Sequence, residues 1–161
     1  MFATSDLRNA SKAELYGELA AQCQALIAGE TDPIANMANC AALIFNSVPR
    51  LNWAGFYLLK GGELVLGPFQ GQPACVRIAF GRGVCGTAAE NRATLRVADV
   101  TKFPGHIACD AASRSEIVVP LLAEDSQLIG VLDVDSPELD RFDADDEAGL
   151  SAIAQIIARV I

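Results

Sequence analysis

Hydrophobic residues recur with a helical period at both ends of the chain. In residues 11–29 they fall every three or four positions, after a Ser-x-x-Glu capping box and before a glycine that stops the pattern. A second such segment, residues 32–48, opens with Asp-Pro, an N-cap followed by a residue suited to the first helical turn. Residues 142–161 show the same period behind a run of acids, which the helix dipole stabilises. The pattern predicts two helices at the start of the chain and one at its end.

The middle of the chain is strand-like, with apolar stretches bounded by turn residues. Two pairs of these stretches are joined by short turns at residues 60–62 and 123–126, which predicts two β-hairpins. A glycine-rich segment, residues 81–91, predicts a loop that feeds a short helix. The predicted strands are residues 53–59, 63–69, 74–80, 94–99, 115–122 and 127–136.

Strands joined by short turns pair antiparallel, so this order of elements indicates an α+β domain with a largely antiparallel sheet and its helices gathered on one side. A chain of 161 residues is long enough for one domain with a buried core. We expect a single domain over residues 1–161, with the helix in residues 1–30 packed on it. The first two helices could form a homodimer contact or cover the sheet with their apolar faces.

Composition and charge exclude several classes of protein. The formal net charge is -8, so the chain lacks the positive field with which proteins attract nucleic acids or anionic membranes. No apolar stretch is long enough to span a bilayer, and the first residues lack the pattern of a secretion signal, which indicates a cytoplasmic protein. Five cysteines are an odd number, so we expect free thiols rather than a disulfide framework. Cys23 and Cys40 lie on predicted helices and are expected to be buried.

The glycine-rich segment also matches a nucleotide-binding pattern. Gly81, Gly83 and Gly86 spell G-x-G-x-x-G after a strand, and Asp99 ends the next strand. That fingerprint belongs to βαβ units, whose parallel crossover needs a longer helix than this segment offers. We therefore expect the glycines to form a tight turn.

The other three cysteines lie in different settings. Cys85 is at the start of the short helix, where a thiol pKa is lowered and the thiol is reactive; alternatively it is a buried structural residue. Cys75 alternates with Arg77 in a predicted strand, which is typical of the core. Cys109 follows the only histidine, His106, by three residues in a loop. Neither a Cys-His pair nor a metal site formed by these cysteines and this histidine has the usual spacing, so we expect no metal.

Three carboxylates are predicted to converge on the last hairpin. Asp133 and Asp135 are two residues apart in a strand, so both point to the face that carries Ile129 and Val131. Glu116 opens the neighbouring strand. Crowded carboxylates raise at least one pKa and so supply a general acid at neutral pH, whereas the alternative is a solvated end of the sheet.

Two aromatic residues, Trp53 and Tyr57, share one face of the first predicted strand with Gly55 between them. Core packing is the ordinary role of such a pair. The alternative is a shallow aromatic pocket beside the carboxylates, which suits a small ligand with an apolar tip and a cationic group.

Longer motifs resemble a known family. GVLDVDS and FDADDEAGLSAIAQIIA resemble the GAF domain, whose fold is a six-stranded antiparallel sheet flanked by helices. NWAGFYLL, LGPFQGQPACVRIAFGRGVCGTA and GHIACDAASRSEIVVPL resemble the free methionine-(R)-sulfoxide reductases of that superfamily. The resemblance runs from the second helix to the C-terminus and includes all three family cysteines.

The resemblance implies a thiol reductase that acts on free methionine (R)-sulfoxide without a metal or an organic cofactor. It implies that Cys109 attacks the sulfoxide sulfur and is left as a sulfenic acid. It further implies that Cys75 resolves this acid to a disulfide, that Cys85 can contribute, and that thioredoxin restores the thiols. By the same resemblance the substrate pocket is lined by Glu116, Asp133, Asp135, Trp53 and Tyr57.

The chemistry of the reaction is consistent with these residues. A sulfoxide oxygen leaves only when it is protonated, so a carboxylic acid with a raised pKa is needed beside the thiol. The alternatives are a GAF sensor that binds a small ligand without catalysis and a redox sensor whose thiols signal without turnover. Sensor domains are typically modules of longer chains, whereas this chain ends with the domain, so we expect the enzyme.

Overall fold

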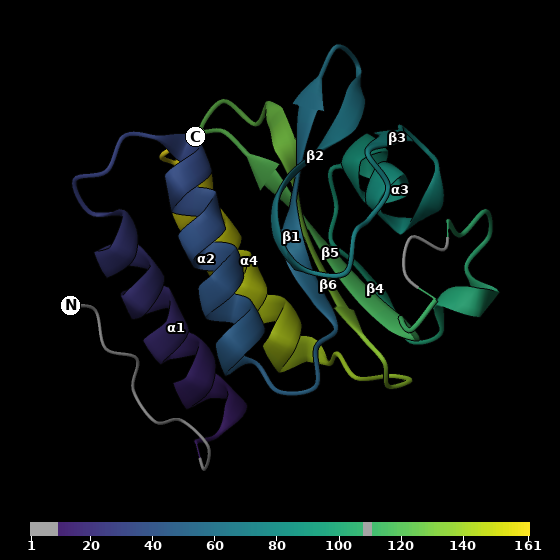
Figure 1. Cartoon of the computed structure of the whole chain (residues 1–161), viewed down its shortest axis with the longest axis horizontal. Coiled ribbons are helices and arrows are strands. Elements are labelled where there is room, and N and C mark those ends of the chain that lie inside the picture. Colours follow the sequence, from purple (N-terminus) through teal and green to yellow (C-terminus); the bar gives the residue numbers. More distant parts are fainter. Residues whose placement is uncertain (1–9, 108–110) are drawn as a thin grey trace.

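The computed structural model describes residues 10–107 and 111–161, which form an antiparallel sheet with helices on both faces (Figure 1). The strands lie in the order β3-β2-β1-β6-β5-β4. The α+β class and the order of elements along the chain are confirmed. The elements are α1 (Lys12–Ile27), α2 (Pro33–Ser47), β1 (Trp53–Lys60), β2 (Glu63–Gly71), β3 (Arg77–Ala79), α3 (Gly83–Asn91), β4 (Leu95–Val97), the short 3-10 helix η1 (Val100–Lys102), β5 (Ser115–Leu122), β6 (Leu128–Ser136) and α4 (Ala144–Ala158).

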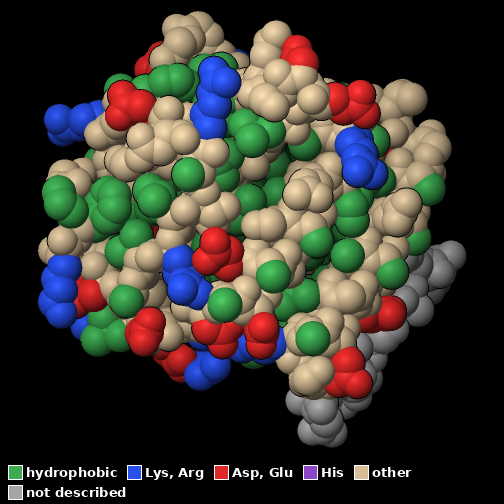
Figure 2. Space-filling view, turned by 180° about the vertical axis from the view of Figure 1, so that it is seen from behind, with side chains coloured by type: hydrophobic (Ala, Val, Ile, Leu, Met, Phe, Trp, Pro, Cys, Tyr) green, Lys and Arg blue, Asp and Glu red, His purple; other side chains and the backbone are tan. Residues whose placement is uncertain are grey.

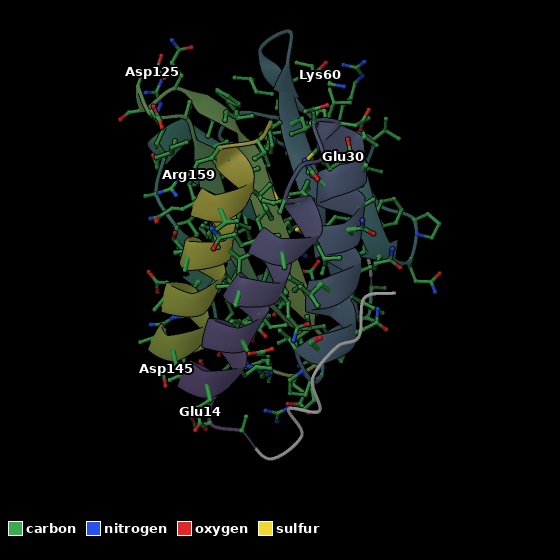
Figure 3. The ribbon with its side chains drawn as sticks, turned by 90° about the vertical axis from the view of Figure 1, so that its left-hand side faces the viewer. Glu14, Glu30, Lys60, Asp125, Asp145 and Arg159 are labelled. Atoms are coloured by element: carbon green, nitrogen blue, oxygen red, sulfur yellow. The ribbon has the colours of Figure 1, made fainter. Side chains whose placement is uncertain are left out.

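Three helices cover one face of the sheet. α2 and α4 pack on the strands, and α1 lies over both of them, with Glu14 of α1 and Asp145 of α4 at the same end of the layer (Figures 1 and 3). The helix starts predicted from the sequence are confirmed: Ser11 forms a capping box with Glu14 at the start of α1, and Asp32 caps α2. The apolar faces of α1 and α2 cover the molecule's own core. Within the described residues no helix has both the length and the apolar character needed to cross a bilayer.

A buried ion-pair network ties α1 to α4. Asp146 is fully buried and accepts hydrogen bonds from the Tyr16 hydroxyl at 2.9 Å and from Arg141 Nη1 at 3.1 Å. Lys12 Nζ lies 2.5 Å from the same carboxylate, and Arg141 also donates to the Pro49 carbonyl oxygen. A buried carboxylate is stable only when it is paired in this way. The acids at the start of α4 therefore do more than complement the helix dipole.

The opposite face of the sheet is covered by α3, so the expectation that all helices gather on one side is wrong. This face carries apolar side chains of β1, β5 and β6, and they are buried against Val84, Ala88 and Ala89 of α3. α3 begins at Gly83 and takes up most of the glycine-rich segment. It is flanked in sequence by β3 and β4, which lie at opposite edges of the sheet, so no βαβ unit exists here.

The glycines of this segment form a tight turn, as expected. Gly81 and Gly83 have positive φ angles of 70° and 60°, which favour glycine. A side chain on Gly86 would collide with the carbonyl oxygen of Ala79, so the turn brings α3 close to the end of β3. The dinucleotide-binding interpretation is excluded by this topology.

Two strand predictions are corrected by the structure. β3 begins at Arg77, so Cys75 precedes the strand instead of lying in it. On β6, Ile129 packs against the core under α1, α2 and α4, while Val131 packs on the opposite face, which α3 covers. The reason is an irregularity in the β5–β6 ladder, where Leu121 pairs with Gly130 and Leu122 with Leu128, which leaves Ile129 as an extra residue.

Candidate active site

Three carboxylates from neighbouring strands meet on the face of the sheet that α3 covers. Glu116 on β5 is the direct cross-strand partner of Asp135 on β6. On the other side of β6, Asp135 pairs with Trp53 and Asp133 with Gly55. Glu116 and Asp133 are each 7% exposed, so these acids are buried in the domain and do not form a solvated end of the sheet. The convergence that the strand period predicted is confirmed.

A thiol from α3 completes this group. Cys85 Sγ lies 3.8 Å from Glu116 Oε1, at the length of a hydrogen bond to sulfur. The Cys85 sulfur and one carboxylate oxygen each from Glu116 and Asp133 lie within 4.8 Å of one another. Cys85 and Glu116 are 31 residues apart in the chain, and no sequence signal links them.

Burial favours the protonated form of each member of this group. It raises the pKa of Glu116 well above its ordinary value, and the charges of Asp133 and Asp135 add to the effect. Burial also raises the pKa of Asp133 to about 6. The pKa of the Cys85 thiol is raised as well, first by burial and then by the charges of Asp133 and Glu116. The burial and the raised pKa of Cys85 favour the buried alternative over a thiol activated by its position at a helix start.

The group opens into a cavity of about 30 Å³. The wall formed by the sheet contains the three acids and Tyr57, and the other walls come from the start of α3 and the loop before β5. The remaining lining residues are Ile78, Arg82, Gly83, Val84, Cys85, His106, Ile107 and Ser113.

The two aromatic residues of β1 have different positions relative to this cavity. Trp53 and Tyr57 are 2% and 1% exposed and stack on each other, and Trp53 also stacks on Phe69 at 5.3 Å between ring centroids. Tyr57 lines the cavity and donates its hydroxyl hydrogen to the Cys75 carbonyl oxygen at 3.0 Å. Trp53 donates its indole hydrogen to the Gln72 carbonyl oxygen instead and packs in the core.

The cysteines differ in redox state. Cys75 is half-buried and disulfide-bonded, so the expectation of free thiols is wrong for this residue. Cys23, Cys40 and Cys85 are free and buried. Cys109 lies outside the described residues.

Ser113 and His106 also line the cavity, although no sequence pattern gave either of them a role. Ser113 is buried, lines the cavity and accepts a hydrogen bond from Asn52 Nδ2 at 2.9 Å. His106 also lines the cavity, and partial burial lowers its pKa. Its Nδ1 atom is buried and has no hydrogen-bond partner among the residues that the structure describes. A single loop serine has no distinguishing pattern, so its position becomes visible only in the fold.

The fold and the site define a GAF domain, and residues 35–161 match the GAF domain family. The free methionine-R-sulfoxide reductase of Escherichia coli is 52% identical over 151 residues, which cover 94% of this chain and 91% of that protein. The chain belongs to the family of free methionine-R-sulfoxide reductases, which are oxidoreductases.

Two solved structures agree closely with this fold. The free methionine-R-sulfoxide reductase of Neisseria meningitidis in complex with its substrate has a TM-score of 0.87 at 48% identity, and the match covers 98% of this chain and 92% of that one. A protein of Burkholderia vietnamiensis that carries the name of a GAF sensor has a TM-score of 0.90 at 62% identity, and the match covers 92% of this chain and 94% of that one. The similarity therefore includes proteins named as enzymes and one named as a sensor.

Proposed function

We propose that this protein reduces free methionine (R)-sulfoxide to methionine and uses Glu116 as the proton donor. The observation that carries the proposal is the buried Glu116 carboxyl, whose pKa is raised by burial and by two neighbouring acids, which favours the protonated form that a proton donor needs. A sensor that only binds a ligand has no need of a protonated carboxylic acid beside a thiol. The names of the relatives in Escherichia coli and Neisseria meningitidis support the same substrate.

In the proposed first step the Cys109 thiolate attacks the sulfoxide sulfur while Glu116 protonates the sulfoxide oxygen. The S–S bond formed by this attack then breaks together with the S–O bond to methionine, while an S–O bond to Cys109 forms. Methionine leaves with two more electrons on its sulfur, and Cys109 becomes a sulfenic acid, oxidised by the same two electrons. The transferred oxygen carries the proton that Glu116 donated.

In the proposed second step the Cys75 thiol attacks the Cys109 sulfenic acid, releasing water and forming a disulfide. The support is that Cys75 is disulfide-bonded while the other described cysteines are free. Cys85 is buried, and its hydrogen bond to Glu116 suits a residue that orients the acid better than a second resolving thiol. A reduced dithiol protein such as thioredoxin then exchanges with this disulfide and restores both thiols, which is consistent with a cytoplasmic location.

The pocket chemistry also suits the free amino acid. Asp133 and Asp135 offer negative charge to an ammonium group, and Tyr57 offers an aromatic wall to the S-methyl group. A peptide-bound methionine sulfoxide has no such ammonium group. We therefore propose that the free amino acid is preferred over a peptide.

The test is a coupled assay with thioredoxin, thioredoxin reductase and NADPH on the separate R and S epimers. We expect sustained NADPH oxidation with free (R)-sulfoxide only, a large loss with the N-acetylated substrate, and none with Cys109→Ser. Glu116→Gln should lose about 10²- to 10⁴-fold in kcat, because it cannot donate the proton. Glu124→Gln, at an exposed position in the turn after β5, is the matched control and should be as active as the parent.

Two other outcomes would count against the proposal. Turnover that survives Glu116→Gln would remove that residue as the proton donor. Tight binding of either epimer without turnover, by a protein whose thiols are reduced, would instead favour a sensor, as the name of the relative from Burkholderia vietnamiensis indicates.

A further inference from the structure

The thiol and the two buried acids also form a set of metal-ligand atoms. Cys85 Sγ and one oxygen each of Glu116 and Asp133 lie within 4.8 Å of one another, and all three residues are buried. Ligand atoms around a tetrahedral Zn²⁺ ion lie about 3.4–3.6 Å apart, given bonds of about 2.3 Å to sulfur and about 2.1 Å to oxygen. The 3.8 Å between Cys85 Sγ and Glu116 Oε1 is already close to this spacing. Small rotations of these side chains would bring all three ligand atoms to this spacing.

A second observation points to a ligand at this place. Asp133 is 7% exposed, and its Oδ1 atom is buried without a hydrogen-bond partner among the residues that the structure describes. A buried carboxylate oxygen without a partner is costly, and it can be satisfied by a cation. Asp133 lines the same cavity as Cys85 and Glu116, so a bound ion would have an open coordination position there.

We propose that the reduced protein binds one thiophilic divalent cation, such as Zn²⁺, through Cys85, Glu116 and Asp133. One thiolate and two carboxylates favour a borderline-soft ion, whereas Mg²⁺ and Ca²⁺ prefer ligand sets made only of oxygen. Three protein ligands and an open position are typical of zinc sites that exchange their fourth ligand. The ion occupies the acids that the proposed function assigns to proton transfer and ammonium binding. Metal and substrate therefore exclude each other, and this consequence alone rests on the proposed function.

The test uses Co²⁺ as a probe, because a Co–thiolate bond gives a charge-transfer band in the near ultraviolet and the measurement needs no turnover. Reduced, chelator-treated protein should bind one Co²⁺ per chain, with Zn²⁺ displacing it and excess Mg²⁺ leaving it in place. Cys85→Ser should lose the band, and Asp133→Asn should weaken Co²⁺ binding at least tenfold. Circular dichroism of each variant shows whether it is folded.

The control concerns the other buried thiols. Cys23 and Cys40 are in contact between α1 and α2 and are the alternative thiol pair. The double variant Cys23→Ala/Cys40→Ala should keep both the band and the stoichiometry. A band that persists in folded Cys85→Ser, or one that depends on Cys75 or on the Cys23 and Cys40 pair, overturns the proposal, as does an absence of binding at millimolar Co²⁺. If free (R)-sulfoxide binds without displacing Co²⁺, the competition between metal and substrate is contradicted, while the metal site itself is not.

Discussion

The Cys85 thiol donates a hydrogen bond to Glu116 Oε1 at 3.8 Å, which links the first turn of α3 to the start of β5. This donor stabilises the ionised form of Glu116 and so opposes the raising of its pKa by burial and by neighbouring acids. We predict that Cys85→Ala raises the pKa of Glu116 further. Cys85→Ser keeps a donor and should raise it less.

Carboxyl ¹³C chemical shifts, followed against pH and assigned with Glu116→Gln, measure this pKa. A Glu116 pKa that falls in Cys85→Ala, or that is highest in Cys85→Ser, would show that the thiol acts through packing and not as a donor.

The raised pKa of Asp133 predicts that the protein becomes less stable as the pH rises. Its pKa is about 6 in the folded protein against 3.8 for an unperturbed group, so the folded state holds a proton that the unfolded state releases. The protonated Asp133 contributes about 3 kcal/mol to the free energy of unfolding. This contribution is complete below about pH 4 and is lost as the pH rises through 6. The raised pKa of Glu116 acts in the same direction.

Urea unfolding of the reduced protein between pH 4 and pH 8 tests this dependence. Asp133→Asn should flatten it and should exceed the parent in free energy of unfolding at pH 8. Asp145→Asn, at an exposed position in the first turn of α4, should keep the parent's slope. An unchanged slope in Asp133→Asn would contradict the prediction.

Gly55 is required for the aromatic stack beside the site. A Cβ atom there would collide with Phe69 and lie 2.6 Å from the Trp53 ring. We predict that Gly55→Ala costs about 1–3 kcal/mol in the free energy of unfolding, as overpacking does, and alters the fluorescence of Trp53, the only tryptophan.

The matched control is Gly17→Ala on α1, where a Cβ atom would meet nothing within 4 Å. It should stabilise the protein by about 0.5–1 kcal/mol, because alanine loses less backbone entropy in a helix. Thermal unfolding followed by fluorescence compares the two variants. Equal stabilities would refute the crowding argument.

Asp146 is predicted to be the acid of α4 on which stability depends most. Asp146→Ala leaves Arg141 buried without its carboxylate partner, which costs about 3–5 kcal/mol. Asp145→Ala, one residue earlier and exposed, should cost less than about 1 kcal/mol. Urea unfolding at neutral pH measures both free energies, and a loss below 1 kcal/mol for Asp146→Ala would show that water enters to solvate Arg141.

The outline of the fold was predictable because its signals are local. A capping box at Ser11, an Asp-Pro start at Asp32 and short turns between strands each act within a few residues, and each has the expected effect in the structure. The shared face of Asp133 and Asp135 follows from the period of a strand in the same way. One error fell where a neighbouring strand decides the outcome: the β5–β6 pairing displaces Ile129 from its expected face.

Family membership was also accessible from the sequence, since motifs longer than the site itself carried the resemblance. The pKa values in the site were not accessible from the sequence. The position of Cys85 at a helix start indicates a lowered thiol pKa, yet burial beside Glu116 and Asp133 raises it. The burial of Asp146, in a run of acids that reads as solvated, was equally inaccessible.

The sequence by itself determined the helices, the strands, the hairpins and the face on which the acids lie, because these depend on periodicity and on neighbours along the chain. Only the tertiary structure decided that α3 lies across that face and brings Cys85 to Glu116, and that Tyr57 lines the cavity while Trp53 does not. It also decided which carboxyls have raised pKa values. The physical reason is that desolvation and charge interactions depend on every element around a group, and these elements are distant in sequence.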